Sequence, residues 1–391
     1  MKNGSVPTLR ISMMCQSSPG ETKPAIVVVG YNREKALGRL LESLGRADYT
    51  GVENIPLIIS LDKSDNTDVT ETAKAFPWKY GEKTVILREE RLGLKKHILS
   101  CGDLTEKYGS IIMLEDDLFV SPVFYHYTLA ALEKVKDQPE VAGVSLYDHR
   151  FNVFARLPFD AVDDGFDNFY FRFPQSWGQA WSFDQWKGFR EWLTLHDGED
   201  LRGKGMPEDA AAWGDSSWLK YALKYVIEEE KYWFYPRISY TTNFFDEGEH
   251  SSAAVNDLQV PLSLERKRDF CFSLPKNSAS KYDQYFENEL LEYEADLYSL
   301  KRRDDCLDPK RPFYSTEILD FKVIKSMALS LRPADNNILF DIPGEGIYLY
   351  DPSVKEKNGR KGGAVLEKYY YPGLNRKKIM RLIGDRMKLL R

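Results

Sequence analysis

The sequence predicts an α/β protein, in which a mainly parallel, Rossmann-like sheet is flanked by helices and followed by a C-terminal α+β extension. Two observations predict this fold. Short apolar, β-branched runs alternate in the first part of the chain with segments whose leucines recur every three or four residues, which is the spacing of one helix face. The runs are apolar throughout, as in strands that helices cover on both faces.

The first strand and helix are expected at the start of this pattern. Ala25–Gly30 is a continuous apolar run, and Leu37, Leu40, Leu41 and Leu44 line one side of the segment that follows it. The sequence therefore predicts a strand and then a helix packed back on the sheet.

Further strands are expected at Ile55–Leu61, Thr84–Leu87 and Ile111–Leu114. After the last of these, Ser121 can act as the N-cap of a helix whose first position holds Pro122 and which runs to about Lys136.

The second half of the chain is rich in aromatic residues from Asn168 onward, in the segments Phe169–Phe173, Trp177–Trp192 and Tyr232–Tyr235. Such rings can pack in the core, or some of them can form the floor of a sugar site. Further along, Glu287–Arg303 is expected to be helical and Gly346–Tyr350 to be a strand.

We expect four segments along the 391 residues. They are a flexible N-terminal segment (1–24), a main domain (25–260) with halves at 25–150 and 151–260, an extension of unknown role (261–370) and a basic amphipathic helix (371–391).

Composition excludes several classes of function. The 54 Lys and Arg residues against 60 Asp and Glu leave a net charge of −6, so no global basic field holds nucleic acid. The four cysteines lie far apart without C-x-x-C spacing, which predicts neither a zinc site nor a disulfide framework. The sequence shows no signal-like start and no apolar stretch of about 18 residues, so we expect a cytoplasmic protein without a membrane span.

The basic tail is the one strongly charged patch. Asn375–Arg391 carries seven basic residues against Asp385 alone, while its apolar residues recur at helical spacing. A basic amphipathic helix can lie on an anionic lipid surface as a peripheral membrane contact. The same apolar stripe can equally dock such a helix on the body of the protein.

Polar residues follow the expected strands where each one ends. Arg33 comes shortly after the first strand, Asp62 ends the second, and Glu115, Asp116 and Asp117 follow the Ile111–Leu114 run. Three consecutive acids repel one another and are costly to desolvate. Carboxylates without His or Cys neighbours favour Mg²⁺ or Mn²⁺, with phosphates and water completing the coordination. The alternative is a solvated turn that caps the following helix.

Other residues at this edge suit a bound nucleotide diphosphate. Asp62 can accept a base N–H, and Arg33 or the run Lys95, Lys96 and His97 can meet phosphate charge. No glycine-rich phosphate loop follows the first strand, so a metal ion is expected to bind the phosphates instead.

With these residues the chain resembles GT-A-fold glycosyltransferases, closest to the N-acetylglucosaminyltransferase I family. The resemblance spans about residues 25–255. The matching segments are Ala25–Arg33, Pro56–Asp62, Lys96 with His97, Ile111–Leu118 with Ser121–Tyr125, and Val144–Asp148. It implies a GT-A fold in which 25–150 binds the nucleotide sugar and 151–260 binds the acceptor and supplies the catalytic base.

The resemblance also implies roles for the donor-site residues. Asp117 would bind the metal directly, Asp116 would face the ribose, and Glu115 would support the cluster. Asp62 and His97 match positions that hold the uracil, and Arg33 matches a donor-site arginine.

Two further assignments come from the same resemblance. Ala212–Trp218 resembles the segment that supplies the catalytic base, which makes Asp215 the base, although Gly214 stands where the family has an adjacent acid. Pro236–Tyr240 and Gly248–Ser252 resemble the final donor-covering loop, from which His250 would approach the diphosphate.

The predicted activity is metal-dependent, inverting transfer of a sugar, with GlcNAc as the leading candidate, from a UDP-sugar to a hydroxyl of a glycan or lipid-linked glycan. Lipid-linked acceptors would place the enzyme in surface polysaccharide assembly. Two alternatives stay open: a sugar nucleotidyltransferase, which would need a glycine-rich N-terminal loop, and a non-catalytic carbohydrate-binding or peripheral membrane protein that kept the fold.

Overall fold

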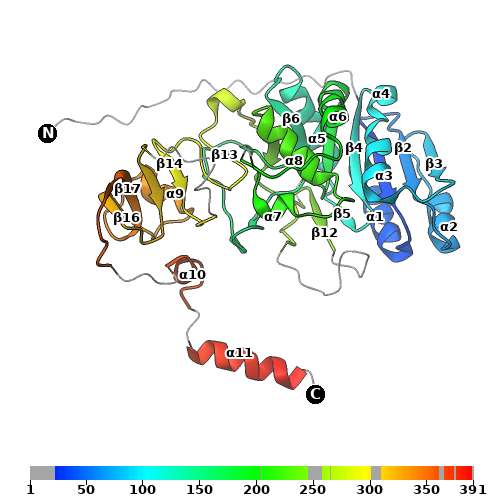
Figure 1. The fold of residues 1–391 in the computed structure, drawn as a ribbon. Helices are drawn as coiled ribbons and strands as arrows, with labels where there is room; N and C mark the ends of the chain where they lie inside the picture. The colour runs from blue at the N-terminus through cyan, green and yellow to red at the C-terminus, as the bar shows by residue number, and fades with distance from the viewer. Residues whose placement is uncertain are drawn as a thin grey trace.

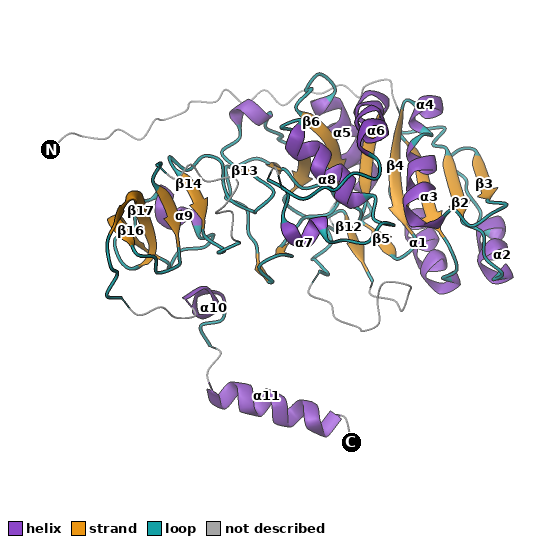
Figure 2. Ribbon diagram, in the orientation of Figure 1, coloured by secondary structure: helices purple, strands orange, loops and turns teal. Residues whose placement is uncertain are grey.

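The structure is a computed structural model, and it describes residues 23–203, 205–244, 258–264, 266–300, 310–360, 365–373 and 376–389. It shows a mixed α/β protein with a large, mostly parallel sheet flanked by helices, as the sequence predicts (Figures 1 and 2). A smaller sheet follows toward the C-terminus, and the helix α11 (Arg376–Leu389) ends the described chain.

The main sheet has nine strands. Five of its neighbouring pairs are parallel and three are antiparallel. The strands in spatial order are β13 (Lys281–Tyr282), β9 (Asn168–Phe171), β11 (Tyr232–Pro236), β6 (Val141–Ser145), β10 (Gln179–Ser182), β4 (Ser110–Glu115), β1 (Ala25–Gly30), β2 (Leu57–Leu61) and β3 (Lys83–Leu87). The last strand at one edge, β13, therefore comes from beyond residue 260.

Helices cover both faces of this sheet. They are α1 (Glu34–Arg46), α2 (Thr67–Ala75), α3 (Gly93–Gly102), α4 (Thr105–Tyr108), α5 (Phe124–Val135), α6 (Phe183–His196), α7 (Glu208–Ala211) and α8 (Leu219–Glu228). Along β1, Ile26 and Val28 pack in the core with α1, α2 and α5, whereas Val27 and Val29 pack in the core with α3, α6 and α8. The wholly apolar sequence of β1 follows from this two-sided burial.

Several expected boundaries move by a few residues. The second strand begins at Leu57 instead of Ile55. The helix expected from Pro122 begins at Phe124, and the Ser121 hydroxyl accepts a hydrogen bond from the Val123 N–H (3.3 Å) in the turn before it. A short strand that the sequence did not predict, β5 (Leu118–Val120), pairs antiparallel with β12 (Thr241–Asn243) and separates the acidic residues from the helix.

The C-terminal part forms a second sheet of four strands. Its strands are β14 (Glu294–Asp296), β15 (Phe313–Ser315), β17 (Gly346–Lys355) and β16 (Phe321–Ala328). The remaining strands, β7 (Phe151–Asn152) and β8 (Leu157–Pro158), form a hairpin. The remaining helices are short: η1 (Pro275–Asn277), α9 (Asp335–Leu339) and α10 (Val365–Tyr370). The strand expected at Gly346–Tyr350 is confirmed and extends to Lys355.

The prediction of a helix at Glu287–Arg303 is wrong over the described residues 287–300. These residues form turns and β14. Acidic side chains bond the backbone there in a non-helical arrangement. The Glu287 carboxylate accepts hydrogen bonds from the N–H groups of Leu297 (2.7 Å) and Tyr298 (3.3 Å). Such side-chain acceptors compete with helical hydrogen bonds.

We predict that Gly178→Ala destabilises the fold at the strand that supports the acidic residues. Gly178 has φ +96°, and a Cβ there would lie 2.6 Å from Thr241 Oγ1 on β12. We expect a loss of about 2–4 kcal/mol in the free energy of unfolding, from left-handed backbone strain plus overpacking. Urea unfolding measures it.

The matched control is Gly51→Ala. Gly51 also has a positive φ, +82°, but nothing lies within 4 Å of a Cβ there, so only the backbone cost of about 1 kcal/mol is expected. Equal losses in the two variants would contradict the close approach of Gly178 to Thr241.

Candidate functional site

The sheet topology brings the ends of several strands to one edge. β1, β2 and β4 are mutually parallel, and β6 runs the same way because β10 is antiparallel to both β4 and β6. The residues that follow these strands therefore share an edge: Arg33 after β1, Asp62 after β2, Asp116 and Asp117 after β4, and Asp148 after β6. The expected gathering of polar residues at one edge is confirmed for Arg33, Asp116 and Asp117, which are in direct contact.

Arg33 neutralises part of the acidic cluster. Its Nε and Nη2 donate to Asp116 Oδ1, the former at 3.1 Å, and its Nη1 donates to Asp117 Oδ2 at 3.1 Å. Burial alone would lower the pKa of Arg33, but the charges of Asp116 and Asp117 outweigh it and raise that pKa. An arginine from the loop after β1 thus compensates part of the negative charge of these acids.

Close packing lets Asp116 lie against the end of β1. A Cβ on Gly30 would lie 3.0 Å from Leu61 Cδ2 and 3.7 Å from Asp116 Oδ2. Asp116 is buried, and it lies beneath Arg33 with only 5% of its side chain exposed. Asp116 is therefore a fixed part of the sheet edge.

Asp117 keeps one carboxylate oxygen without a partner. Oδ1 is buried and has no hydrogen-bond partner among the described residues, while Oδ2 is bonded to Arg33. The Asp117 carbonyl accepts a hydrogen bond from the Phe244 N–H (2.8 Å), which fixes the loop against the end of β12. Burial raises the pKa of Asp117, Arg33 opposes this, and Asp116 adds to it. A cation bound to Oδ1 would stabilise the ionised carboxylate of Asp117, because it would offset the cost of burying that charge.

Glu115 holds a proton at neutral pH. Burial, then the charges of Asp117 and Asp116, raise its pKa to about 8, against a smaller opposing effect of Arg33. With Glu115 neutral, two aspartates and one arginine leave a charge of −1 at the cluster. A divalent cation would turn this into +1, which suits a phosphate ligand.

A divalent metal fits these residues, although no group of three or more His, Cys, Asp and Glu in the described ranges could hold one. Mg²⁺ and similar hard ions that bind with phosphates need only one or two protein carboxylates. Asp117 Oδ1 is such an oxygen. Asn243 on β12 is paired in register with Leu118, and its Oδ1 is a second buried oxygen without a hydrogen-bond partner in the described chain.

Asp62 is bonded to backbone. Its carboxylate accepts hydrogen bonds from the N–H groups of Lys63 (2.9 Å), Leu92 (2.8 Å) and Gly93 (2.9 Å). These contacts hold the start of α3 against the end of β2. The role of Asp62 toward a base stays a prediction.

His97 is neutral and buried below the edge. Its Nε2 is 2.8 Å from the Ser60 hydroxyl, which also accepts a hydrogen bond from Arg88 (3.2 Å). Burial lowers the pKa of His97 to about 4, so it supplies no positive charge to a phosphate at neutral pH. That corrects the expected charge role of His97, whereas its contact with uracil stays a prediction. Its neighbour Lys96 is exposed on α3.

The predicted base lies on the surface. Asp215 is in the connection between α7 and α8, its side chain is fully exposed, and it pairs with Lys220 Nζ at 3.3 Å. Lys220 Nζ also donates to the Trp213 carbonyl (3.0 Å), which holds the connection in place. His250 lies outside the described residues.

Asp148 is a further carboxylate at this edge to which the sequence analysis assigns no role. It is buried after β6, pairs with Arg150 Nε (2.5 Å), and its N–H donates to the Ser239 hydroxyl (3.0 Å). Burial, against the opposing effect of Arg150, raises its pKa to about 7. Asp148 follows an apolar strand, as Asp62 does, and this position could have identified it from the sequence.

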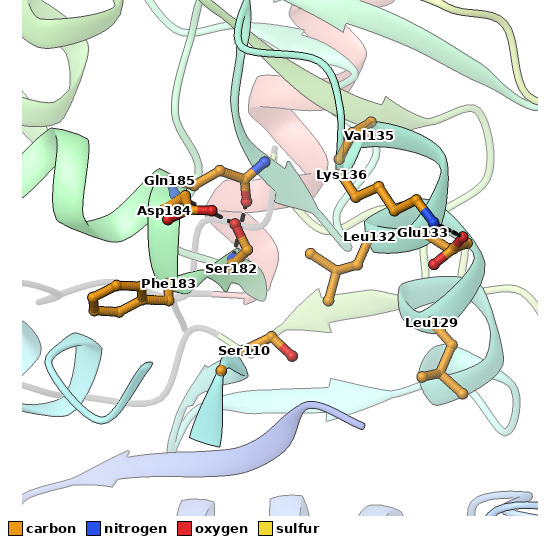
Figure 3. Close-up of a pocket in the computed structure, with 11 residues that line it drawn as sticks. Ser110, Leu129, Leu132, Glu133, Val135, Lys136, Ser182, Phe183, Asp184 and Gln185 are labelled. Atoms are coloured by element: carbon orange, nitrogen blue, oxygen red, sulfur yellow. Dashed lines mark hydrogen bonds and ion pairs between the residues drawn. The ribbon is translucent and has the colours of Figure 1, made fainter. Parts of the chain in front are cut away.

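A separate cavity of about 200 Å³ lies at the opposite end of β4 (Figure 3). It is lined by Ser110 at the start of β4, by the first turn of α6 with Gln185, and by Leu132 of α5 and Lys136 directly after it. None of the predicted site residues lines it. It is therefore distinct from the acidic cluster after Glu115.

Comparisons with known proteins do not assign this chain to a family. No family model matches the sequence, and no curated protein matches it. One solved structure with partial similarity is mannosyltransferase PcManGT from Pyrobaculum calidifontis in complex with GDP-Man and Mn²⁺, with a TM-score of 0.31 and 16% identity over 52% of this chain. The match spans about half of that protein (55%). A similarity at this level carries no inference about the ligands of this chain.

We predict that Glu115→Gln changes how stability depends on pH. The native state keeps the Glu115 proton up to about pH 8, whereas the unfolded chain loses it near the ordinary value of 4.5. Between pH 4.5 and about pH 8 the native state binds one more proton than the unfolded chain. The free energy of unfolding therefore falls as pH rises, by at most about 1.4 kcal/mol per pH unit. The variant lacks this slope and should gain stability relative to wild type toward pH 8.

Urea unfolding at several pH values measures the difference. Glu71→Gln is the control, since Glu71 is on α2 with 74% of its side chain exposed, and that variant should parallel wild type. A constant offset between Glu115→Gln and wild type from acid to pH 8 would contradict the bound proton.

Proposed function

We propose that this protein is a GT-A-fold glycosyltransferase that uses a divalent metal to transfer a sugar from a UDP-sugar to a hydroxyl group. The observation that carries the proposal is Asp117 Oδ1, which is buried and has no hydrogen-bond partner in the described part of the chain. Arg33 and β12 hold Asp117 at the sheet edge where ligands of α/β proteins bind. GlcNAc is the leading donor sugar, and a glycan or lipid-linked glycan is the proposed acceptor.

Asp117 would hold Mn²⁺ or Mg²⁺ through Oδ1. When bound, the ion supplies Lewis-acid stabilisation of the negative charge that appears on departing UDP. Arg33 keeps Asp116 and Asp117 oriented before the ligand arrives, so little reorganisation accompanies binding. Asp116 then presents a fixed carboxylate to the ribose.

The nucleoside would lie beside the β2 end. Asp62 fixes the start of α3 there, and His97, neutral and bonded to Ser60, can serve the uracil as a hydrogen-bonding group rather than as a charge. Lys96 is exposed on the same helix and can meet the outer phosphate charge. His250 keeps its proposed role in a donor-covering loop.

Two aspartates compete for the role of catalytic base. Inversion needs a carboxylate that removes the acceptor proton on the face opposite the leaving group. Asp215 is the assignment implied by the resemblance. Asp148 is the second candidate, because a buried carboxyl with a pKa of about 7 at the same edge is poised for proton transfer at neutral pH.

Asp117→Asn should remove metal-dependent donor binding. The variant replaces the negatively charged carboxylate that would bind the metal by a neutral amide. We expect UDP binding in the presence of Mn²⁺, measured by calorimetry, to weaken by about 100-fold or more. Asp137→Asn, an exposed acid after α5, is the control and should bind like wild type. Unchanged UDP affinity in Asp117→Asn would contradict the proposed metal site.

Comparing Asp215→Asn with Asp148→Asn identifies the base. The variant that loses the base should release UDP from a UDP-sugar about 100-fold or more slowly, with donor KM little changed. We expect this of Asp215→Asn. If Asp148→Asn alone shows it, Asp148 is the base. No UDP release by wild type, with or without Mn²⁺, would instead favour a non-catalytic protein.

A further inference from the structure

The helix α11 presents an uncovered apolar face. Five apolar side chains of this helix are each between 39% and 68% exposed: Ile379, Met380, Leu382, Ile383 and Met387. At 100° per residue they fall within one half of the helix circumference. Figure 1 shows α11 standing apart from both sheets, beyond α10.

The opposite face of α11 is basic. Lys377, Arg381 and Lys388 share it with Asp385, the single acid, whose carboxylate lies 3.7 Å from both Arg381 and Lys388. The helix contains six basic residues and this one acid, a net charge of +5. Because the whole chain carries −6, the residues outside α11 carry −11. The helix therefore differs in charge from the rest of the protein.

The preceding helix fixes where α11 is presented. Tyr370 of α10 is buried, and its hydroxyl donates to the Tyr298 hydroxyl (3.2 Å). Arg332 Nη2 donates to the carbonyls of Tyr369 (3.1 Å) and Tyr370 (2.8 Å). The tail is thus anchored to the C-terminal sheet up to Tyr370, six residues before α11 begins.

We propose that α11 lies flat on an anionic phospholipid bilayer, with its apolar face in the lipid interface and its basic face toward the headgroups. An exposed apolar stripe flanked by lysine and arginine has the chemistry that such surfaces bind. A second copy of α11 does not suit this apolar face, because two helices that each carry a net charge of +5 repel each other.

The helix lies on the bilayer rather than crossing it. Its 14 residues extend about 21 Å, less than the roughly 30 Å of the hydrocarbon core. None of the described helices is long and apolar enough for a membrane span. This inference does not rest on the glycosyltransferase proposal, since lipid binding is measured without donor or metal.

Liposome flotation of the full chain tests the proposal. We expect it to float with phosphatidylcholine vesicles that contain about 30% phosphatidylglycerol, not with phosphatidylcholine alone, and to be released at about 1 M NaCl, where charges are screened beyond roughly 3 Å. Equal binding to neutral and anionic vesicles, or no binding to either, would overturn it.

Paired variants assign the contact to α11. Leu382→Glu with Ile383→Glu should reduce partition into anionic vesicles at least about tenfold, because both side chains lie in the apolar face. The control, Leu195→Glu with Leu264→Glu, makes the same chemical change at residues that are 76% and 74% exposed elsewhere, and should bind like wild type. Equal loss in the two double variants would count against α11.

Amide hydrogen exchange separates lipid binding from docking on the body. In the full chain, residues 376–389 should exchange rapidly without vesicles and gain protection only with anionic vesicles. Protection that is already present without vesicles, and is unchanged by them, would show that the helix docks on the protein and would overturn the proposal.

Discussion

The ion pair that Arg33 makes with Asp116 and Asp117 is the interaction on which the candidate site depends. Without it, the buried Asp116 and the half-buried Asp117 carboxylates would face each other at the end of β4 at a high desolvation cost. With it, Asp116 and Asp117 are both paired with Arg33, and one oxygen of Asp117 has no hydrogen-bond partner among the residues that the structure describes. The site is therefore stable without a ligand and still retains a net negative charge.

The rest of the fold supports this arrangement. β1 and β4 are adjacent and parallel, so the loop that carries Arg33 and the turn that carries the acids meet at one edge. β12 closes the turn from the other side through the Phe244 N–H bond to the Asp117 carbonyl. Ser239, which precedes β12, bonds both Asp148 N–H and the Thr241 carbonyl. A single short strand thus connects the two acidic loops.

The sequence predicted β1, β2 and β4 well because burial on both faces makes them almost wholly apolar; β3 is only partly buried and was found from its short apolar run. β1 matches Ala25–Gly30, and β4 extends the expected Ile111–Leu114 by one residue at each end. β5 was not predicted, since three residues carry no usable periodicity. The segment after Glu287 was predicted wrongly because its acidic side chains bond distant backbone N–H groups, which no local pattern reveals.

The chemistry of the site was harder to predict than its location. The acids were found because polar residues follow apolar strands, yet their pairing with Arg33, 83 residues away in the case of Asp116, arises only from the sheet. The neutrality of His97 and the raised pKa of Asp148 likewise come from tertiary burial.

A crystal structure of the full chain with UDP and Mn²⁺ tests the central claim most directly. The account predicts an anomalous manganese peak within about 2.5 Å of Asp117 Oδ1, with the diphosphate completing its coordination and Arg33 still on Asp116. Manganese and UDP bound elsewhere, with Asp117 Oδ1 uncoordinated, would contradict it.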